Sequence, residues 1–278
     1  MLGRSRYLTC AGREIHFMEW GDAEAPPLIM WHGLARTGRD FDALAEVMAR
    51  GYWVICPDTP GRGLSQWAVD RDSEYCYDSY GRTALSLCEN LGIEQMSWIG
   101  TSMGGVLGIT LAGGAMKGRI TSMVINDVGP EIAMEGVERI VAYVGNPPVF
   151  DTIGELETWL RTVYVPFGDN PDGFWRTMTE TSCRRMDDGR VTVHYDPAIV
   201  TQLTLHRADL DQWDAYDAIE CPVLLLRGEN SDVLHPDVAQ AMVDRGPKVQ
   251  LIEIPGFGHA PTLGSMHEYA VIKKFLET

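Results

Sequence analysis

The amino-acid sequence predicts an α/β fold, in which a mostly parallel sheet carries helices on both faces. Short apolar runs typical of buried strands alternate with stretches whose apolar residues recur at helical spacing. Loops containing glycine or proline separate these runs. The alternation stops in the middle of the 278-residue chain and resumes towards its end. Such alternation is typical of parallel sheets, and the interruption indicates an inserted segment.

Each predicted strand and helix of the core is indicated by a pattern of residues in the sequence. An Ala11-Gly12 turn separates two strand-like runs, Tyr7–Cys10 and Ile15–Trp20, and this pattern predicts an antiparallel hairpin at the start of the chain. Further strands are expected where short apolar runs end at glycine, proline or polar residues. These strands are expected at 27–31, 52–56, 96–99 and 120–125, with helices at 41–50, 80–91 and 106–116.

The middle of the chain does not continue this alternation. It is rich in tyrosine, phenylalanine and tryptophan, and most of these side chains are expected to form a small core of their own. We therefore divide the chain into an α/β core, residues 1–130 and 212–278, and an inserted helical lid, residues 131–211. Within the lid, helices are expected at 133–144, 153–164 and 173–181.

A nucleophile elbow is predicted at Ser102. The apolar run Met96–Ile99 leads directly into a Gly-x-Ser-x-Gly sequence, and a helical segment of small residues follows. The serine must lie on a tight strand-to-helix turn, where side chains two positions away would collide with neighbouring elements. Gly100 and Gly104 remove those side chains. The turn also places Ser102 at the positive end of a helix, which favours developing negative charge.

A serine hydroxyl needs a base, and the base needs an orienting acid. Downstream of Ser102, the apolar strand Pro222–Gly228 runs into an acidic loop that contains Asp232. A later strand, Val249–Ile254, runs into a glycine- and proline-rich loop that contains His259. The order Ser, Asp, His is that of a triad built on strand ends. We therefore predict Ser102 as nucleophile, His259 as base and Asp232 as the orienting acid.

An oxyanion hole is predicted from two backbone N–H groups. The expected strand 27–31 ends at His32-Gly33, and the loop that follows supplies the N–H of Leu34. The residue after the serine, Met103, supplies the second N–H. The His32 ring could act as a catalytic group, but we favour a structural role in which it ties loops together beneath the site.

In order and spacing, these motifs resemble the α/β-hydrolase superfamily, in its lid-bearing branch of bacterial esterases, lactonases and C–C bond hydrolases. The resemblance covers nearly the whole chain outside the middle segment, and it implies the α/β-hydrolase fold with a catalytic triad. Its motifs are specific for fold and triad but weak for substrate. The matching segments are His32-Gly33, Asp58 to Ser65, Gly100 to Gly105, Asp232 and Gly258-His259.

The resemblance leaves two choices to be weighed. Some superfamily members carry the acid after an earlier strand, where this chain has Asp127, so Asp127 competes with Asp232. Arg36, Arg39 and Asp40 follow the His32-Gly33 loop and could line the mouth of a pocket, where an arginine could bind a substrate carboxylate. We expect them to be solvated loop charges.

Composition narrows the function classes. A formal net charge of −16 argues against nucleic acid as a partner, and an anionic membrane surface would repel the chain. The first seven residues lack the apolar stretch of a signal peptide, so we expect a cytoplasmic protein with six reduced cysteines. Neither a cofactor nor a metal site is expected, and a homo-oligomer is left open.

The sequence thus predicts a serine hydrolase that cleaves a small or medium carboxylic ester, or a lactone, through an acyl-enzyme. Its partner is a small-molecule ester substrate. A C–C bond hydrolase of dienoic diketo acids is the runner-up, but such proteins carry Gly-Pro-Gly after His-Gly, where this chain has Leu34-Ala35-Arg36. A ligand-sensing receptor that keeps the triad is a third alternative, and fold alone does not decide against it.

Overall fold

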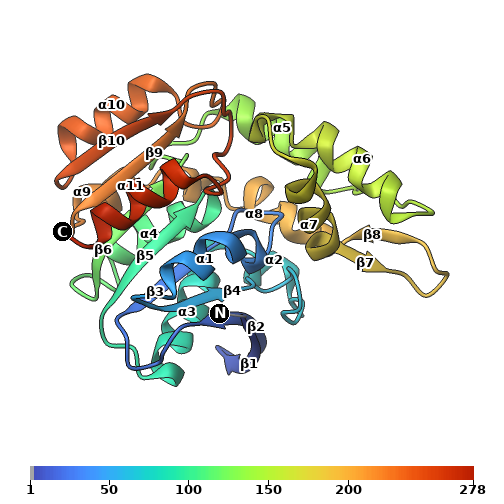
Figure 1. The fold of residues 1–278 in the computed structure, drawn as a ribbon, viewed down its shortest axis with the longest axis horizontal. Helices are drawn as coiled ribbons and strands as arrows, with labels where there is room; N and C mark the ends of the chain where they lie inside the picture. Colours follow the sequence, from blue (N-terminus) through green and yellow to red (C-terminus); the bar gives the residue numbers. More distant parts are fainter. Residues whose placement is uncertain (1–2) are drawn as a thin grey trace.

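The computed structural model describes residues 3–278, so residues 1 and 2 of the predicted core lie outside the described residues. Its central feature is an eight-stranded sheet in the order β1-β2-β4-β3-β5-β6-β9-β10 (Figure 1). Strand β2 is antiparallel to both of its neighbours, and the other pairings in this sheet are parallel. The predicted entry hairpin and mostly parallel sheet are confirmed. The strands are β1 (Arg4–Cys10), β2 (Arg13–Trp20), β3 (Pro27–Trp31), β4 (Trp53–Pro57), β5 (Met96–Thr101), β6 (Ile120–Asn126), β9 (Val223–Gly228) and β10 (Val249–Ile254).

Helices cover both faces of the sheet because the buried strands are apolar on both sides. In β3, Leu28 and Met30 pack into one hydrophobic cluster, whereas Ile29 and Trp31 pack into another. Side chains of α1 and α11 belong to the first cluster, and those of α3, α4, α9 and α10 belong to the second. These helices are α1 (Asp42–Met48), α3 (Tyr77–Leu91), α4 (Met103–Gly113), α9 (Trp213–Asp217), α10 (Pro236–Arg245) and α11 (Met266–Leu276), and a short helix α2 (Arg71–Glu74) precedes α3.

The segment between β6 and the last two strands of the sheet forms a separate helical layer at one side of the core (Figure 1). We name residues 131–211 the helical insertion. Its two ends meet in an antiparallel bridge between Glu131 and Asp211, so the chain leaves and re-enters the core at one place. It contains α5 (Met134–Val144), α6 (Ile153–Val163), α7 (Asp172–Ser182), β7 (Cys183–Arg185), β8 (Val191–Val193) and α8 (Thr201–Thr204).

The β7–β8 hairpin of the insertion was not predicted. Each of its strands has three residues, which is too short for a recognisable alternation of apolar and polar side chains. The hairpin is completed by a bridge from Phe150 to Val191, two residues far apart in the sequence. The three predicted helices of this segment are present and differ from the expected ranges by at most one residue at either end.

Two further observations concern the described residues as a whole. Between residues 3 and 278, no helix combines the length and apolar character needed to cross a membrane. The six cysteines, all within the described range, are free, and five of them are buried.

Candidate active site

The candidate site lies at the carboxyl edge of the parallel strands, where the loops of several strands meet. Each loop that the sequence singled out follows a different strand of the sheet. Ser102 follows β5, His259 follows β10, and the two competing acids, Asp127 and Asp232, follow β6 and β9.

Ser102 lies on the tight strand-to-helix turn that the sequence predicts. Ser102 has φ 52° and ψ −116°, an unfavourable conformation for a residue with a side chain, and α4 begins at the next residue. A Cβ atom on Gly100 would lie 2.1 Å from the carbonyl oxygen of Gly104, and one on Gly104 would lie 2.0 Å from that of Trp31. Both glycines are therefore required by close contacts, as the sequence predicts.

His259 lies beside Ser102. His259 is buried, and its Nε2 lies 2.8 Å from Ser102 Oγ, within hydrogen-bond distance. The loop that carries it is held by Asn126, whose side-chain amide donates to the carbonyl oxygen of Pro261 over 2.8 Å. The pairing of Ser102 with His259 that the sequence predicts is present in the structure.

The acid that contacts His259 is Asp127, and this corrects the choice of Asp232. Asp127 Oδ2 lies 2.9 Å from His259 Nδ1, and the aspartate side chain is fully buried. The backbone N–H of Gly228 donates to its Oδ1 over 2.7 Å, and Ser231 Oγ donates to its Oδ2 over 2.7 Å. The end of β9 and the loop after it therefore do not supply the acid. They supply two of the hydrogen bonds that hold Asp127, which follows β6.

Asp232 has a different partner. Arg139, on α5 of the helical insertion, donates from Nε and Nη2 to the two carboxylate oxygens of Asp232 over 2.5 and 2.9 Å. Partial burial raises the pKa of Asp232, but the hydrogen bond and charge of Arg139 outweigh it, so the pKa lies below its ordinary value. Asp232 failed as the predicted acid because its carboxylate is engaged by a residue 93 positions earlier, which local sequence does not reveal.

The two residues predicted as oxyanion donors are both close to Ser102 in the fold or in the chain. Leu34 lines the same hollow as Ser102 and His259, and Met103 is the first residue of α4. The carbonyl oxygen of Leu34 accepts a 2.8 Å hydrogen bond from Nε of the buried Arg62, which fixes the orientation of this peptide segment. Arg62 is a positioning residue that the sequence analysis did not identify. Its only sequence signal is a charged residue between two glycines.

His32 ties loops together, as expected. The backbone N–H of Thr59 donates to its Nε2 over 3.0 Å, so the ring proton is on Nδ1, which donates to the carbonyl oxygen of Gly33 over 2.7 Å. Burial lowers the pKa of His32 to about 4, so the ring is neutral near pH 7. It anchors the residue immediately before Leu34.

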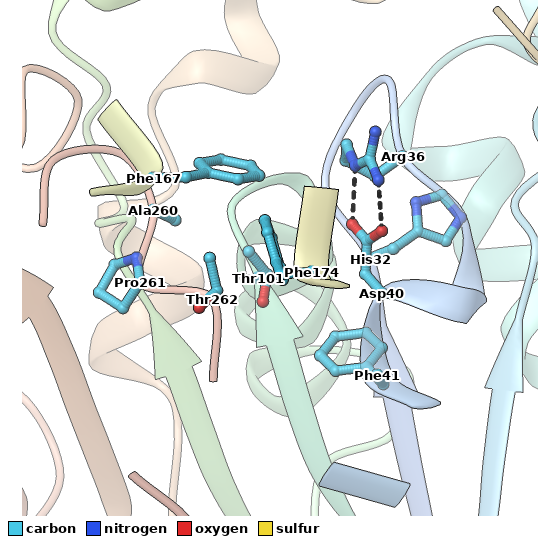
Figure 2. Close-up of a pocket in the computed structure, with 10 residues that line it drawn as sticks. All are labelled: His32, Arg36, Asp40, Phe41, Thr101, Phe167, Phe174, Ala260, Pro261 and Thr262. Atoms are coloured by element: carbon cyan, nitrogen blue, oxygen red, sulfur yellow. Dashed lines mark hydrogen bonds and ion pairs between the residues drawn. The ribbon is translucent and has the colours of Figure 1, made fainter. Parts of the chain in front are cut away.

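Arg36 is not a solvated loop charge, and that expectation is wrong for this residue. Its side chain is 6% exposed and donates from Nε and Nη2 to the carboxylate of Asp40 (Figure 2). The guanidinium also lies 5.2 Å from the ring centre of Tyr164, on the helical insertion. Arg36 and Asp40 line the hollow that contains Ser102. Arg36 and Asp40 therefore present no net charge to this side of the hollow, because the guanidinium and the carboxylate neutralise each other.

Comparison with known proteins gives a consistent result. Residues 28–271 match a family model described as the alpha/beta hydrolase family. The chain is 37% identical to a 3-hydroxybutyrate-oligomer hydrolase from Cupriavidus necator, across 99% of this chain and 97% of that protein. It is 25% identical to a bifunctional esterase/perhydrolase from Acinetobacter calcoaceticus, across 89% and 90% of the two chains.

A solved structure resembles the whole chain. An alpha/beta hydrolase from Novosphingobium aromaticivorans superimposes with a TM-score of 0.90 at 36% identity, covering 99% of this chain and 98% of that one. The similarity therefore extends over the sheet and the helical insertion together.

Proposed function

This chain belongs to the α/β hydrolase family of enzymes, and on that basis we propose that it is a serine esterase with Ser102, His259 and Asp127 as its catalytic triad. The observation that carries the proposal is the continuous chain of hydrogen bonds from Ser102 Oγ through the His259 ring to the buried Asp127 carboxylate. This is the arrangement that makes a serine hydroxyl nucleophilic.

The acylation step follows from the geometry. His259 Nε2 accepts the hydroxyl proton while Ser102 Oγ attacks the ester carbonyl. Asp127 holds the His259 ring through Nδ1 and stabilises its positive charge. The N–H groups of Leu34 and Met103 bind the oxyanion of the tetrahedral intermediate. Each donor of this kind contributes about 3–4 kcal/mol to transition-state stabilisation.

The remaining steps regenerate the serine. His259 returns the proton to the leaving alcohol, and the acyl group remains on Ser102 Oγ. A water molecule then gives a proton to His259 while its oxygen attacks the acyl carbonyl. His259 passes that proton to Ser102 Oγ as the bond from Oγ to the acyl carbon breaks, which releases the carboxylic acid and restores the serine hydroxyl. Asp127 holds the His259 ring in the same orientation throughout, because its own carboxylate is fixed by the N–H of Gly228 and the hydroxyl of Ser231.

The helical insertion acts as a lid in this proposal. Ile140, Tyr143, Tyr164 and Phe167 of the insertion line the hollow that also contains Ser102, so the nucleophile lies between core and insertion. The hollow holds only about 50 Å³, enough for a reacting ester group and a few further atoms. This size favours a small or medium ester over a bulky one, and the apolar lining lowers the local dielectric.

The relative from Cupriavidus necator suggests which esters to test. Its name describes hydrolysis of 3-hydroxybutyrate oligomers, which are short linear esters of a hydroxy acid. We propose esters of this kind as the substrate class of the present enzyme. The paired Arg36 and Asp40 fit a neutral ester group better than a charged one at the reacting position.

The test is hydrolysis of p-nitrophenyl acetate and of 3-hydroxybutyrate dimers and trimers by wild type and Ser102→Ala. We expect the variant to lose at least about 10⁴-fold in kcat, since the nucleophile is removed. Ser97→Ala is the matched control. Ser97 lies on β5, the strand that precedes Ser102, and its Oγ forms a 2.9 Å hydrogen bond with Ser122 Oγ. Removing the Ser97 hydroxyl should leave kcat unchanged. A Ser102→Ala enzyme with near wild-type kcat would refute the proposed triad.

A further inference from the structure

The hollow around Ser102 continues outwards as a path between core and helical insertion. A middle hollow shares Arg36, Thr101 and Phe167 with the inner one and is bounded on one side by Ala260, Pro261 and Thr262 (Figure 2). An outer groove follows, between α1, α7 and the start of α11. Asp40 lines all three spaces, while Phe174 and Thr262 line both the middle hollow and the outer groove.

The path is narrow in its middle. The middle hollow holds about 30 Å³, whereas the outer groove holds about 410 Å³. In Figure 2 the Phe174 ring lies between the Pro261–Thr262 segment and the Arg36–Asp40 pair. A space of about 30 Å³ holds only two or three water-sized groups in all. It therefore fits a single narrow chain and disfavours a bulky or cyclic acyl group.

The outer groove combines apolar side chains with an excess of negative charge. Phe174, Met178 and Phe257 supply apolar surface. The positive charge of Arg39 is paired with Asp42, over 2.6 Å. Two further carboxylates line the groove, those of Asp169 and Glu268.

Glu268 is buried and accepts from the backbone N–H groups of Leu263 and Ser265 over 3.1 and 2.8 Å. These bonds hold its carboxylate in place without a cation, and Asp169 is exposed. A carboxylate at the end of a bound chain would therefore be repelled from the groove, whereas an uncharged end would be accepted.

Resting on the proposed esterase function, we propose that this path binds the acyl chain of the substrate, past Phe174 and into the outer groove. The substrate class is then an ester whose acyl part is a narrow chain, with branches no larger than the single methyl groups of 3-hydroxybutyrate, and ends in an uncharged group. In an oligomer of a hydroxy acid, the acyl part of the cleaved bond carries the hydroxyl end and the leaving alcohol carries the carboxylate end. The groove thus selects the hydroxyl end.

The experiment measures kcat/KM for p-nitrophenyl esters that differ only in the acyl group. With linear acyl groups from acetate to octanoate, we expect an increase of about two- to fourfold per methylene until the groove is filled. The branched trimethylacetate should react at least tenfold more slowly than the linear pentanoate. The glutarate half-ester, which ends in a carboxylate, should likewise react at least tenfold more slowly than the pentanoate.

Variants of Phe174 test the narrow passage, and a variant of Asp169 tests the repulsion of carboxylates by the outer groove. Phe174→Trp should lower the ratio of kcat/KM for hexanoate or octanoate to that for acetate at least fivefold. Phe174→Ala should raise the ratio of kcat/KM for trimethylacetate to that for pentanoate. Asp169→Lys should raise the ratio of kcat/KM for the glutarate half-ester to that for pentanoate several-fold.

Phe150→Trp is the matched control for Phe174→Trp. Phe150 lies in the same insertion, with its ring centre 6.0 Å from that of Trp159, and is not among the residues that line the path. This variant should keep the full chain-length profile, and thermal unfolding of each variant checks that it is folded.

The outcomes distinguish the two proposals. Ser102-dependent turnover of acetate with a flat chain-length profile, or an equal loss on all esters in Phe174→Trp, would overturn the acyl path and leave the esterase standing. Failure of folded wild type to hydrolyse any ester, acetate included, would overturn the esterase function and the acyl path with it.

Discussion

The core and the helical insertion both contribute to the active site, but they hold their side chains in different ways. In the core, Asp127 is fully buried and its carboxylate has three hydrogen-bond partners from two other loops. One contact between the insertion and the core is the ion pair of Arg139 with Asp232, which leaves both side chains about one third exposed (31% and 34%). Buried, fully bonded groups resist displacement, whereas exposed pairs contribute little and exchange with water.

Two aspartates that look alike in the sequence differ in their surroundings in the structure. Asp127 and Asp232 each follow an apolar strand and lie at the same edge of the sheet. The aspartate enclosed by the core contacts His259, and the aspartate near the insertion pairs with Arg139. The fixed geometry around His259 is thus held by buried groups of the core, whereas the pair of Asp232 with Arg139 is partly exposed to water.

The largest expected effect is the loss of kcat in Asp127→Asn. The amide can donate to His259 Nδ1, which would favour the tautomer whose Nε2 carries the proton and cannot accept one from Ser102. By analogy with other serine triads, we expect kcat for p-nitrophenyl acetate to fall about 10⁴-fold. Asp232→Asn, assayed in parallel, is the matched control and should stay within about tenfold of wild type. A larger loss in Asp232→Asn than in Asp127→Asn would reverse the assignment.

A smaller effect is expected from the buried His32 in the core, measured as stability against pH. Its pKa is about 4 in the folded protein and about 6.5 when unfolded, so the unfolded state binds more protons between these values. The contribution of His32 to the free energy of unfolding is complete above pH 6.5 and falls by about 3 kcal/mol down to pH 4.

Urea unfolding at pH 7 and at pH 4 measures this contribution. The control is His32→Asn, which lacks the titrating group, so the pH-dependent loss should be about 3 kcal/mol smaller in the variant than in wild type. Equal pH dependence in both proteins would show that His32 does not need to stay neutral in the folded core.

The smallest effect is expected at the contact between insertion and core. A double-mutant cycle with Arg139→Gln and Asp232→Asn measures the coupling of the two side chains in the free energy of unfolding. Because the pair is partly exposed, we expect a coupling of about 1 kcal/mol or less, reduced further by salt. A coupling above about 3 kcal/mol would place this pair among buried ion pairs and remove the contrast with the core.

Local features of the sequence were sufficient for several parts of the site. The Gly-x-Ser-x-Gly turn can only be formed with small residues at Gly100 and Gly104, since a Cβ atom at either would overlap backbone atoms. The position of His259 after a strand, in a loop rich in glycine and proline, was likewise readable from neighbouring residues. Strand periodicity predicted the mostly parallel sheet for the same reason, because it depends on residues close in the chain.

Only the tertiary structure decided which acid contacts His259, what Arg36 does, and how the insertion covers the site. Parallel strands bring all their carboxyl ends to one edge of the sheet, so several aspartates at strand ends are candidates. The sequence does not show which of them lies within hydrogen-bond distance of His259. The choice depends on Gly228 and Ser231 bonding to Asp127, and on Arg139 engaging Asp232. These partners lie about 90 to 105 positions away in the chain, and their contacts are set by the packing of whole elements, which no local pattern encodes.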